Sequence, residues 1–464
     1  MHSGFLSRFP LIQRNFPAFD GCSVILQFPN DQEVNTHLLC QREYSKEMER
    51  NGTGHTPGKN VLRSITQKKV YIKTYGCTYN EGDSRKLAAV LKHQGCTLVS
   101  RLEDADAVIV NTCTVVGATE RKVLKHLRSL RSYPLYVTGC MATVRRDAIL
   151  SACDPVFIHP GEIQAAYAGE GDAPAGPVGI VQVCQGCRGS CSYCITRMAR
   201  GPLVSADADE ILGEVMALVQ NGAVEIRLTG QDVSAWGADI GSHLGALLPR
   251  ITDVPGMFRV RVGMMNPATL SPIAEIVAES FAGEKIFKFL HLPVQSGSDA
   301  VLKRMGRGYT AEEALAIVKT FRTHCPGISL HTDIICGYPG ETEEEFCETL
   351  DLVFRMQPDK VNVTRYSPRP GTPAAGKKDM PDRYKKERSR TLLACAEKIA
   401  KSRNAAWISR EVPVLITEVL RPGSAMGRTQ YYQGVVVKGD FSPGTVRMVR
   451  LTKERTYYFI GEPV

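Results

Sequence analysis

The stretch "GIVQVCQGCRGSCSYC", residues 179–194, joins an apolar run to a dense group of cysteines. The apolar run predicts a buried strand, and most of the cysteines then lie on the loop that follows it. Cys187, Cys191 and Cys194 have the spacing C-x3-C-x2-C. Three thiolates on a tight loop can hold three corners of a 4Fe-4S cluster, and the missing fourth ligand leaves one iron open to a small molecule. An open iron predicts catalysis rather than a structural role.

Cys184 is the ambiguous thiol of this stretch. With the other three it could form a closed four-thiolate zinc or iron site. It lies within the predicted strand, however, where a buried cysteine behaves as a small hydrophobic residue. A fourth ligand would also close the open iron. We therefore expect three of the four thiols to bind the cluster, with the closed site as the alternative.

Six segments from residue 176 onward repeat a pattern of strand followed by helix, which is fewer than the eight units of a closed barrel. This predicts a partial, laterally open (β/α)6 barrel with its chemistry at the carboxyl ends of the strands. The predicted strands are "GPVGIVQVCQ" (176–185), "EIRLTGQD" (225–232), "FRVRVGMMN" (258–266), "KFLHLPVQ" (288–295), "SLHTDIICGYPG" (329–340) and "KVNVTRYSPR" (360–369).

The part before this barrel has a doubly wound α/β pattern with a parallel sheet. Its predicted strands are "KVYIKTYG" (69–76), "DADAVIVNT" (104–112) and "PLYVTG" (134–139). A cysteine follows each strand directly, namely Cys77, Cys113 and Cys140. Because the carboxyl ends of parallel strands share one edge of a sheet, the three thiols can converge there. We expect a metal site, with core packing as the alternative.

The carboxyl-terminal part begins with a basic helix, residues 382–410, and continues from residue 411 as alternating segments that predict a small β-barrel. Residues 383–410 contain nine Lys or Arg and two Glu, a net charge of +7. Residues 120–146 contain seven Lys or Arg and one Glu, a net charge of +6. Such bands can contact phosphate groups and position RNA without reading its sequence. A solvated basic helix face is the alternative for each band.

The composition agrees with a globular protein of several domains. The chain has 464 residues, a formal net charge of +9, 15 cysteines and 43% hydrophobic residues. No stretch approaches the roughly 20 apolar residues of a membrane-spanning helix. Cysteines without an amino-terminal secretion signal favour reduced thiols. We therefore expect a cytoplasmic protein with no membrane partner.

A series of motifs runs through the chain in a fixed order. They are "YGCTYN", "NTCTV", "GCMA", the C-x3-C-x2-C loop, "HLPVQSGSDAVLKRMGRGYT", "DIICGYPGETEEEF" and "YSPRPGTPAA". Together with the terminal barrel, this series resembles the radical S-adenosylmethionine (SAM) methylthiotransferase family over residues 69–464. The resemblance makes the terminal barrel a TRAM domain, an RNA-binding module in most members. We expect a disordered extension (1–67), a methylthiotransferase amino-terminal domain (68–171), a radical SAM core (172–406) and a TRAM domain (407–464). A natural start near Met48 is the alternative for the extension.

The resemblance implies two 4Fe-4S clusters and SAM as cofactors. An auxiliary cluster would be held by Cys77, Cys113 and Cys140, and the catalytic cluster by Cys187, Cys191 and Cys194. One SAM would methylate a sulfur of the auxiliary cluster. A second would yield the 5′-deoxyadenosyl radical, which removes hydrogen from an unactivated carbon before methylthio insertion. Expected partners are the anticodon loop of tRNA, a sulfur donor, and an electron donor such as ferredoxin or flavodoxin.

The strand ends supply candidates for SAM contacts, because glycines allow close backbone approach and polar side chains can bond a ribose. Tyr193 is the aromatic residue that this motif usually carries before its third cysteine. The candidates are Tyr193, Thr229, Gly230, Gln231, Gln295, Ser296 and Gly337.

The substrate is expected to be a tRNA base. "CRGSCSYCITRMARG", "LTGQDVSAWGADIG" and "MMNPATL" look most like the archaeal and eukaryotic branch, which modifies N6-threonylcarbamoyladenosine next to the anticodon. Bacterial branches usually carry Pro after the third cysteine, where this chain has Ile195. Isopentenyladenosine in tRNA or a ribosomal protein is the alternative substrate. A non-catalytic, metal-stabilised RNA-binding protein is the alternative from another class.

Overall fold

The structure is a computed structural model that describes residues 61–170 and 176–464. Most of the expected amino-terminal extension lies outside the described residues. Residues 61–67 were expected to belong to that extension, but they are part of the first domain. Leu62 and Ile65 are fully buried there, because they pack against the first strand and the helix that follows it.

The first domain contains a five-stranded parallel sheet, in the order β2-β1-β3-β4-β5. The three expected strands are present as β1 (Lys69–Thr74), β3 (Ala107–Thr112) and β4 (Leu135–Gly139). Two short edge strands, β2 (Thr97–Leu98) and β5 (Val156–Phe157), were not expected. Each edge strand has two residues, which is too short for an alternating pattern to be visible in the sequence.

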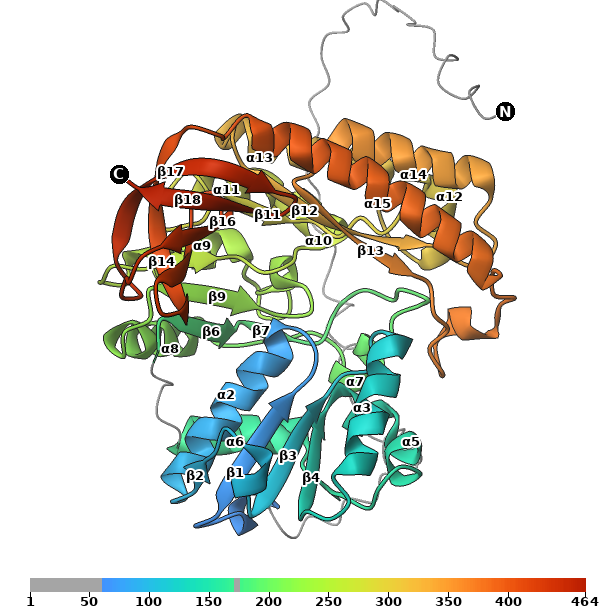
Figure 1. The fold of residues 1–464 in the computed structure, drawn as a ribbon. Coiled ribbons are helices and arrows are strands. Elements are labelled where there is room, and N and C mark those ends of the chain that lie inside the picture. Colours follow the sequence, from blue (N-terminus) through green and yellow to red (C-terminus); the bar gives the residue numbers. More distant parts are fainter. Residues whose placement is uncertain (1–60, 171–175) are drawn as a thin grey trace, which may run out of the picture. The chain divides into compact units, whose positions relative to one another are not determined.

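Helices cover both faces of this sheet (Figure 1). On one face, α2 (Thr78–His93) and α6 (Pro160–Glu170) bury Leu87, Leu91 and Ile163. On the other face, α3 (Gly117–Ser129), α4 (Cys140–Val144) and α5 (Arg146–Leu150) enclose a second apolar core. Two cores on opposite faces of one parallel sheet confirm the doubly wound architecture.

The second part contains six parallel strands that follow one another in sequence order. They form two three-stranded sheets, β10-β9-β6 and β11-β12-β13, and a bridge between Val260 and Ile286 joins the sheets. The strands are β6 (Val178–Gln182), β9 (Glu225–Thr229), β10 (Arg259–Arg261), β11 (Phe289–His291), β12 (Ser329–Cys336) and β13 (Lys360–Arg365). The predicted six-unit partial barrel is therefore confirmed.

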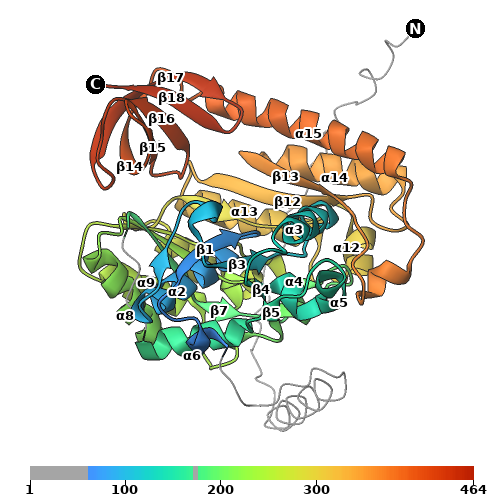
Figure 2. The same ribbon diagram turned by 60° about the horizontal axis from the view of Figure 1, so that its bottom comes forward.

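Helices pack on the outside of these strands and share one large apolar core with them. They are α8 (Ala208–Gln220), α9 (Leu244–Asp253), α10 (Pro267–Leu270), α11 (Ala274–Ser280), α12 (Asp299–Met305), α13 (Ala311–His324), α14 (Glu343–Met356) and α15 (Asp382–Ala405). Figures 1 and 2 show α14 and α15 side by side along β13. The start of α14 is fixed by a capping box, in which Thr342 and Glu345 bond each other's backbone N–H groups.

The basic helix α15 is partly a core helix. Leu392, Ala396 and Ile399 belong to the barrel core. Lys385 and Arg388 are also buried, and they form ion pairs with Asp379 and Glu341 at 2.8 and 2.7 Å. Seven other basic residues lie in 383–410. Six of them are exposed, and Arg403 is partly buried. The full net charge of this band is therefore not available to a partner.

The chain ends in a closed five-stranded barrel, in the order β14-β15-β16-β18-β17. Its strands are β14 (Glu411–Arg421), β15 (Ser424–Arg428), β16 (Gly434–Lys438), β17 (Val446–Arg455) and β18 (Tyr458–Pro463). Tyr432 lies between β15 and β16 and donates a hydrogen bond to Glu225 Oε1 at 2.7 Å. Its ring also packs against Phe287 and Phe289, at 4.9 Å between centroids in each case. The small barrel therefore contacts the amino-terminal ends of the large barrel's strands.

Helices long and apolar enough to cross a membrane do not occur in residues 61–170 and 176–464.

Candidate active site

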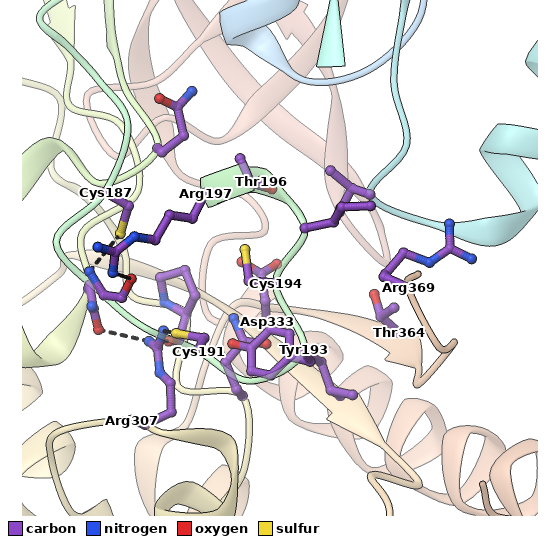
Figure 3. Close-up of a pocket in the computed structure, with 18 of the residues that line it drawn as sticks. Cys187, Cys191, Tyr193, Cys194, Thr196, Arg197, Arg307, Asp333, Thr364 and Arg369 are labelled. Atoms are coloured by element: carbon purple, nitrogen blue, oxygen red, sulfur yellow. Dashed lines mark hydrogen bonds between the residues drawn. The ribbon is translucent and has the colours of Figure 1, made fainter. Parts of the chain in front are cut away.

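A cavity of about 360 Å³ lies at the carboxyl ends of the large barrel's strands. Cys187, Cys191 and Cys194 line it, on the loop after β6 (Figure 3). Val115 and Val116 of the first domain line it as well, two and three residues after Cys113. One cavity thus receives residues from the loop that carries one set of thiols and from the segment that follows a thiol of the other set.

Two glycines shape the thiol loop. Gly186 has φ +77°, and a Cβ there would overlap the carbonyl oxygen of Pro202. Its N–H donates to Gln231 Oε1 at 2.6 Å, which fixes the start of the loop to the end of β9. Further along, the N–H of Gly189 donates to Cys187 Sγ at 3.2 Å. The loop is thus built so that its backbone can stabilise charge on a sulfur.

A chain of hydrogen bonds supports the second thiol of the loop. Arg307 Nη1 donates to Cys191 Sγ at 3.3 Å, and its Nη2 donates to Asn266 Oδ1 at 2.8 Å (Figure 3). The N–H of Asn266 in turn donates to Asp232 at 3.1 Å. The guanidinium is therefore oriented by the ends of two barrel strands, and it places a positive charge beside the sulfur.

Burial raises the pKa of two acidic groups at this site. The pKa of Cys187 rises to about 11, chiefly through burial and against the hydrogen bond from Gly189. The pKa of Asp232 is also raised by burial, although Ser234, Thr269 and the N–H of Asn266 all donate to its carboxylate. A positively charged metal centre bound at the loop would favour the thiolate form.

The predicted SAM contacts fall into two groups. Tyr193, Gln231 and Gln295 line the cavity. The others are not among its lining residues in the described chain; they are Thr229, Gly230, Ser296 and Gly337. Ser296 is fully buried, with its hydroxyl bonded to Thr349 and to the N–H of Ser298. A Cβ at Gly230 would lie 2.6 Å from Cys184 Sγ. These four residues lie outside the lining of the cavity, and their contact with SAM stays a prediction.

Several lining residues were not expected from the sequence. Asn266, Arg307 and Asp333 reach the cavity from three different strand ends or helix ends, and Arg365 and Arg369 come from the segment at and after β13. "MMNPATL", which contains Asn266, and "MGRGYT", which contains Arg307, were noted only as family motifs. A polar residue after each strand end was the available signal, but such residues also occur in ordinary turns.

Cys184 is a core residue. Its side chain is 2% exposed, and its Sγ donates to the carbonyl oxygen of Asp232 at 3.3 Å. It packs with Val183 and Val233 in the core of the barrel. This placement agrees with the expectation that Cys184 is not part of the thiol set in the cavity.

The second set of thiols lies at the carboxyl ends of the neighbouring strands β1, β3 and β4. Cys113 and Cys140 are buried, whereas Cys77 is exposed at the N-cap of α2. Burial, and then the nearby Cys140 and Cys77, raise the pKa of Cys113 to about 11. A Cβ at Gly76 would lie 3.0 Å from Cys113 Cβ, so glycine allows the first loop to approach the second. The three thiols thus converge as the pattern predicted.

In the described part of the chain, no three His, Cys, Asp or Glu side chains are placed to hold one metal ion. Each thiolate of a cubane binds a different iron, so the ligands of a cluster stand farther apart than the ligands of one ion. Three thiols around an open cavity, with N–H donors on two of the sulfurs, suit such a cluster with one open iron.

Known families match three successive parts of the chain. Residues 69–158 match the "Uncharacterized protein family UPF0004", residues 181–353 the "Radical SAM superfamily" and residues 408–464 the "TRAM domain".

Relatives match over almost their whole length. The "Probable threonylcarbamoyladenosine tRNA methylthiotransferase" of Pyrococcus horikoshii is 39% identical, over 85% of this chain and 99% of its own. The "tRNA-2-methylthio-N(6)-dimethylallyladenosine synthase" of Moorella thermoacetica is 35% identical, over 86% and 99%. Among solved structures, the radical SAM methyltransferase TsrM from Kitasatospora setae has a TM-score of 0.47 and 17% identity, over 66% of this chain and 75% of its own.

The partial barrel with its thiol loop defines a radical SAM enzyme. With these relatives, the chain belongs to the radical SAM methylthiotransferase family. Membership implies SAM and a 4Fe-4S cluster as cofactors. The terminal barrel is a TRAM domain, as expected.

Proposed function

We propose that this enzyme adds a methylthio group to carbon 2 of N6-threonylcarbamoyladenosine next to the anticodon of tRNA, with two SAM molecules as methyl donor and radical source. The observation that carries the proposal is the single cavity that Val115 and Val116 share with the thiols of the loop. A substrate base held in this cavity would lie between the thiol loop and the segment that follows Cys113. That placement suits a reaction in which one site activates carbon and the other supplies sulfur.

Each thiol set has its own role in this proposal. Cys187, Cys191 and Cys194 hold a 4Fe-4S cluster, with Arg307 and the N–H of Gly189 steadying two of the sulfurs. When bound, this cluster supplies the electron that cleaves SAM. The auxiliary cluster is held by the other set, Cys77, Cys113 and Cys140. Gln231, Gln295 and Tyr193 line the cavity where SAM would be oriented.

The lining of the cavity is mostly apolar, but a few polar side chains in it favour the threonylcarbamoyl substituent. This group carries amide, hydroxyl and carboxylate functions, which need partners when they leave water. Asp333 faces the cavity and is held by His291 Nε2 and Asn362 Nδ2 at 2.9 and 2.6 Å. Arg365 also lines it, and its side chain has no hydrogen bond or ion pair with the residues described. A carboxylate on the substrate would give this arginine a partner.

The names of relatives support the same substrate. Archaeal relatives from Pyrococcus horikoshii and Pyrococcus abyssi, both named for threonylcarbamoyladenosine, are each 39% identical to this chain. Relatives named for dimethylallyladenosine are 33 to 35% identical, which makes isopentenyladenosine the second candidate. A dimethylallyl group is apolar, however, and would offer Arg365 no hydrogen-bond acceptor.

The proposal includes tRNA as the partner of the TRAM domain and of exposed basic residues. Arg383, Lys386 and Arg390 are exposed on α15, and Arg121, Lys122, Lys125 and Arg128 are exposed on α3. It keeps the domain limits 68–171, 172–406 and 407–464, with residues 61–67 added to the first. A ferredoxin or flavodoxin as electron donor and a separate sulfur donor complete the expected partners.

Mass spectrometry of tRNA nucleosides tests this function. Cells without the gene should lose the methylthio form of threonylcarbamoyladenosine and accumulate its unmodified precursor. The wild-type gene should restore the product, whereas a Cys191→Ala gene should not. Loss of methylthio-isopentenyladenosine instead, with the threonylcarbamoyl product unchanged, would assign the enzyme to the second candidate.

A further inference from the structure

Arg200 joins the radical SAM loop to the second thiol set. It is the last residue of α7 (Thr196–Arg200), which begins two residues after Cys194. Its side chain leaves the barrel and enters the first domain, where it is 4% exposed. There Nε donates to Cys140 Sγ at 3.3 Å. The loop that carries one set of thiols thus also delivers a guanidinium to the other.

Groups of the first domain hold this guanidinium in place. Its Nη2 donates to Asp83 Oδ2 at 2.7 Å and to Asn80 Oδ1 at 2.8 Å. Asp83 is itself buried, and Gln182 and Gln164 donate to its other oxygen. The guanidinium also lies over the ring of Tyr79, at 4.7 Å from the centroid. A planar group fixed by so many contacts cannot turn freely, so its remaining N–H bonds have defined directions.

One nitrogen of Arg200 has no partner. Nη1 is buried away from water and makes no hydrogen bond with the residues described. A buried N–H without an acceptor costs free energy, and such a group in a native protein calls for an explanation. The neighbouring nitrogen Nε already donates to a sulfur, that of Cys140. An acceptor of the same chemistry, bound beside Cys140, would satisfy Nη1.

We propose that Arg200 is a positioning residue of the auxiliary site, where it orients Cys140 and donates from Nη1 to a sulfur of the bound cluster. The inference rests on the proposed function, which places the auxiliary cluster on Cys77, Cys113 and Cys140. Hydrogen bonds to cluster sulfurs and nearby positive charge stabilise the reduced state, which is more negative. Arg200 therefore makes the reduction potential of this cluster less negative.

The other thiol set offers a matched comparison. Arg307 donates to Cys191 Sγ at the same distance, 3.3 Å, from the segment just after helix α12. Each set thus has one arginine on one sulfur. If each arginine acts on its own cluster, replacing one should move one potential and leave the other unchanged.

Redox titration of the anaerobic full-length enzyme, followed by electron paramagnetic resonance, tests this proposal. Arg200→Gln should shift the midpoint potential of the auxiliary cluster to more negative values, and Arg200→Lys should shift it less. Arg307→Gln should shift only the other cluster. Wild-type potentials in both Arg200 variants, or a shift of the Cys191 cluster in either, would overturn the proposal.

Asp83→Asn controls for a purely structural role, because it weakens the anchoring of Arg200 without contacting a thiol. A purely structural role would make Asp83→Asn and Arg200→Gln equally unstable and leave the potential of the auxiliary cluster unchanged in Arg200→Gln. If Arg200→Gln fails to fold, the midpoint potential of the auxiliary cluster in Arg200→Lys tests the proposal instead. The iron count separates this proposal from the function it rests on. About four irons in the wild-type enzyme would show that the auxiliary cluster is absent. About eight irons with unchanged potentials would overturn only the role of Arg200.

Discussion

Arg369 Nη1 lies 2.8 Å from Glu120 Oε2, so the segment after the last barrel strand is paired with helix α3 of the first domain. Both side chains are about nine-tenths buried. Arg369 also donates to the carbonyl oxygen of Thr114, and it lines the cavity. The ion pair therefore places the segment after Cys113 against the wall of the active site.

Removing this ion pair should reduce stability moderately and should also reduce methylthiolation. Arg369→Gln should cost about 2 kcal/mol of unfolding free energy, a usual value for hydrogen bonds to a charged group. Methylthiolation should fall further than 5′-deoxyadenosine release. Arg145→Gln breaks the other ion pair of Glu120, at 2.6 Å, at a residue that does not line the cavity. Arg145→Gln should affect stability alone. An equal fall in methylthiolation relative to 5′-deoxyadenosine release in the two variants would contradict this prediction.

Iron content should separate Cys184 from the thiols of the loop. The anaerobic wild-type enzyme should contain about eight irons per chain, because each set supplies three thiolates to a four-iron cubane. Cys184→Ala should keep nearly all of this iron, since its sulfur packs in the core. Cys191→Ala should lose about half. Equal losses in the two variants, or zinc in place of iron, would show that the ligand assignment is wrong.

The two thiol sets should differ in their products. Cys113→Ala should lose methylthiolation but still release 5′-deoxyadenosine from SAM with a strong reductant, because the loop that contains Cys191 is intact. Cys191→Ala should lose both activities. Circular dichroism and the iron count of the untouched cluster must first show that each variant is folded. Release of 5′-deoxyadenosine by Cys191→Ala at the wild-type rate would reverse the roles.

Two arginines that lie two residues apart on α15, and so on different faces of the helix, should have different effects. Arg390 is exposed, whereas Arg388 is buried against Glu341 and Glu343 at 2.7 and 3.0 Å. Arg390→Gln should reduce the slope of log tRNA affinity against log salt by about 0.7 to 0.9 if this side chain contacts one phosphate. Arg388→Gln should instead lower thermal stability, because it leaves Glu341 buried without its cation. An unchanged slope in Arg390→Gln would show that Arg390 does not contact the RNA.

His331 should contribute to the loss of stability in mild acid. Its ring packs against Phe289 at 4.6 Å between centroids. Its pKa is held well below the ordinary value of 6.5, first by burial and then by nearby cations, which are His291, Lys360, Arg261 and Arg428. Below about pH 6.5, His331 therefore binds a proton in the unfolded chain but not in the folded chain. The free energy of unfolding decreases as the pH drops below this value.

Denaturation at several pH values measures this effect. One such histidine changes the unfolding free energy by at most about 1.4 kcal/mol per pH unit. His331→Gln should therefore lose stability less steeply than the wild type between about pH 6.5 and 5.5. Parallel curves for the two proteins would mean that His331 is protonated in the folded state as well.

Much of the fold could be predicted because its main elements are periodic. The six barrel strands and the strands that precede Cys77, Cys113 and Cys140 lie where the apolar runs place them. The convergence of those three thiols also followed from the rule that parallel strands end at one edge. Short elements such as β2 and β5 could not be predicted, because two residues carry no period.

The placement of the cysteines could be predicted from the sequence, but the contacts of the arginines could not. Cysteine spacing is visible in sequence, whereas the contacts of Arg200 and Arg307 depend on how separate segments pack. The same limit applied to α15, where charge alone could not tell the buried Arg388 from the exposed Arg390. Ser296 likewise follows a strand end, but its hydroxyl turns inward to Thr349.

The short helix α7 has a consequence for how this chain can vary in length. In the proposed arrangement Cys194 and Arg200 serve two different sites, and only residues 195–199 separate them. One inserted residue would rotate everything after it by about 100° around the helix axis, which would turn the guanidinium away from Cys140. Exchanges of side chain at an outward position such as Met198, which is 43% exposed, do not have this effect. We expect deletion and insertion scanning to find this segment intolerant to any change of length, even where it accepts substitutions.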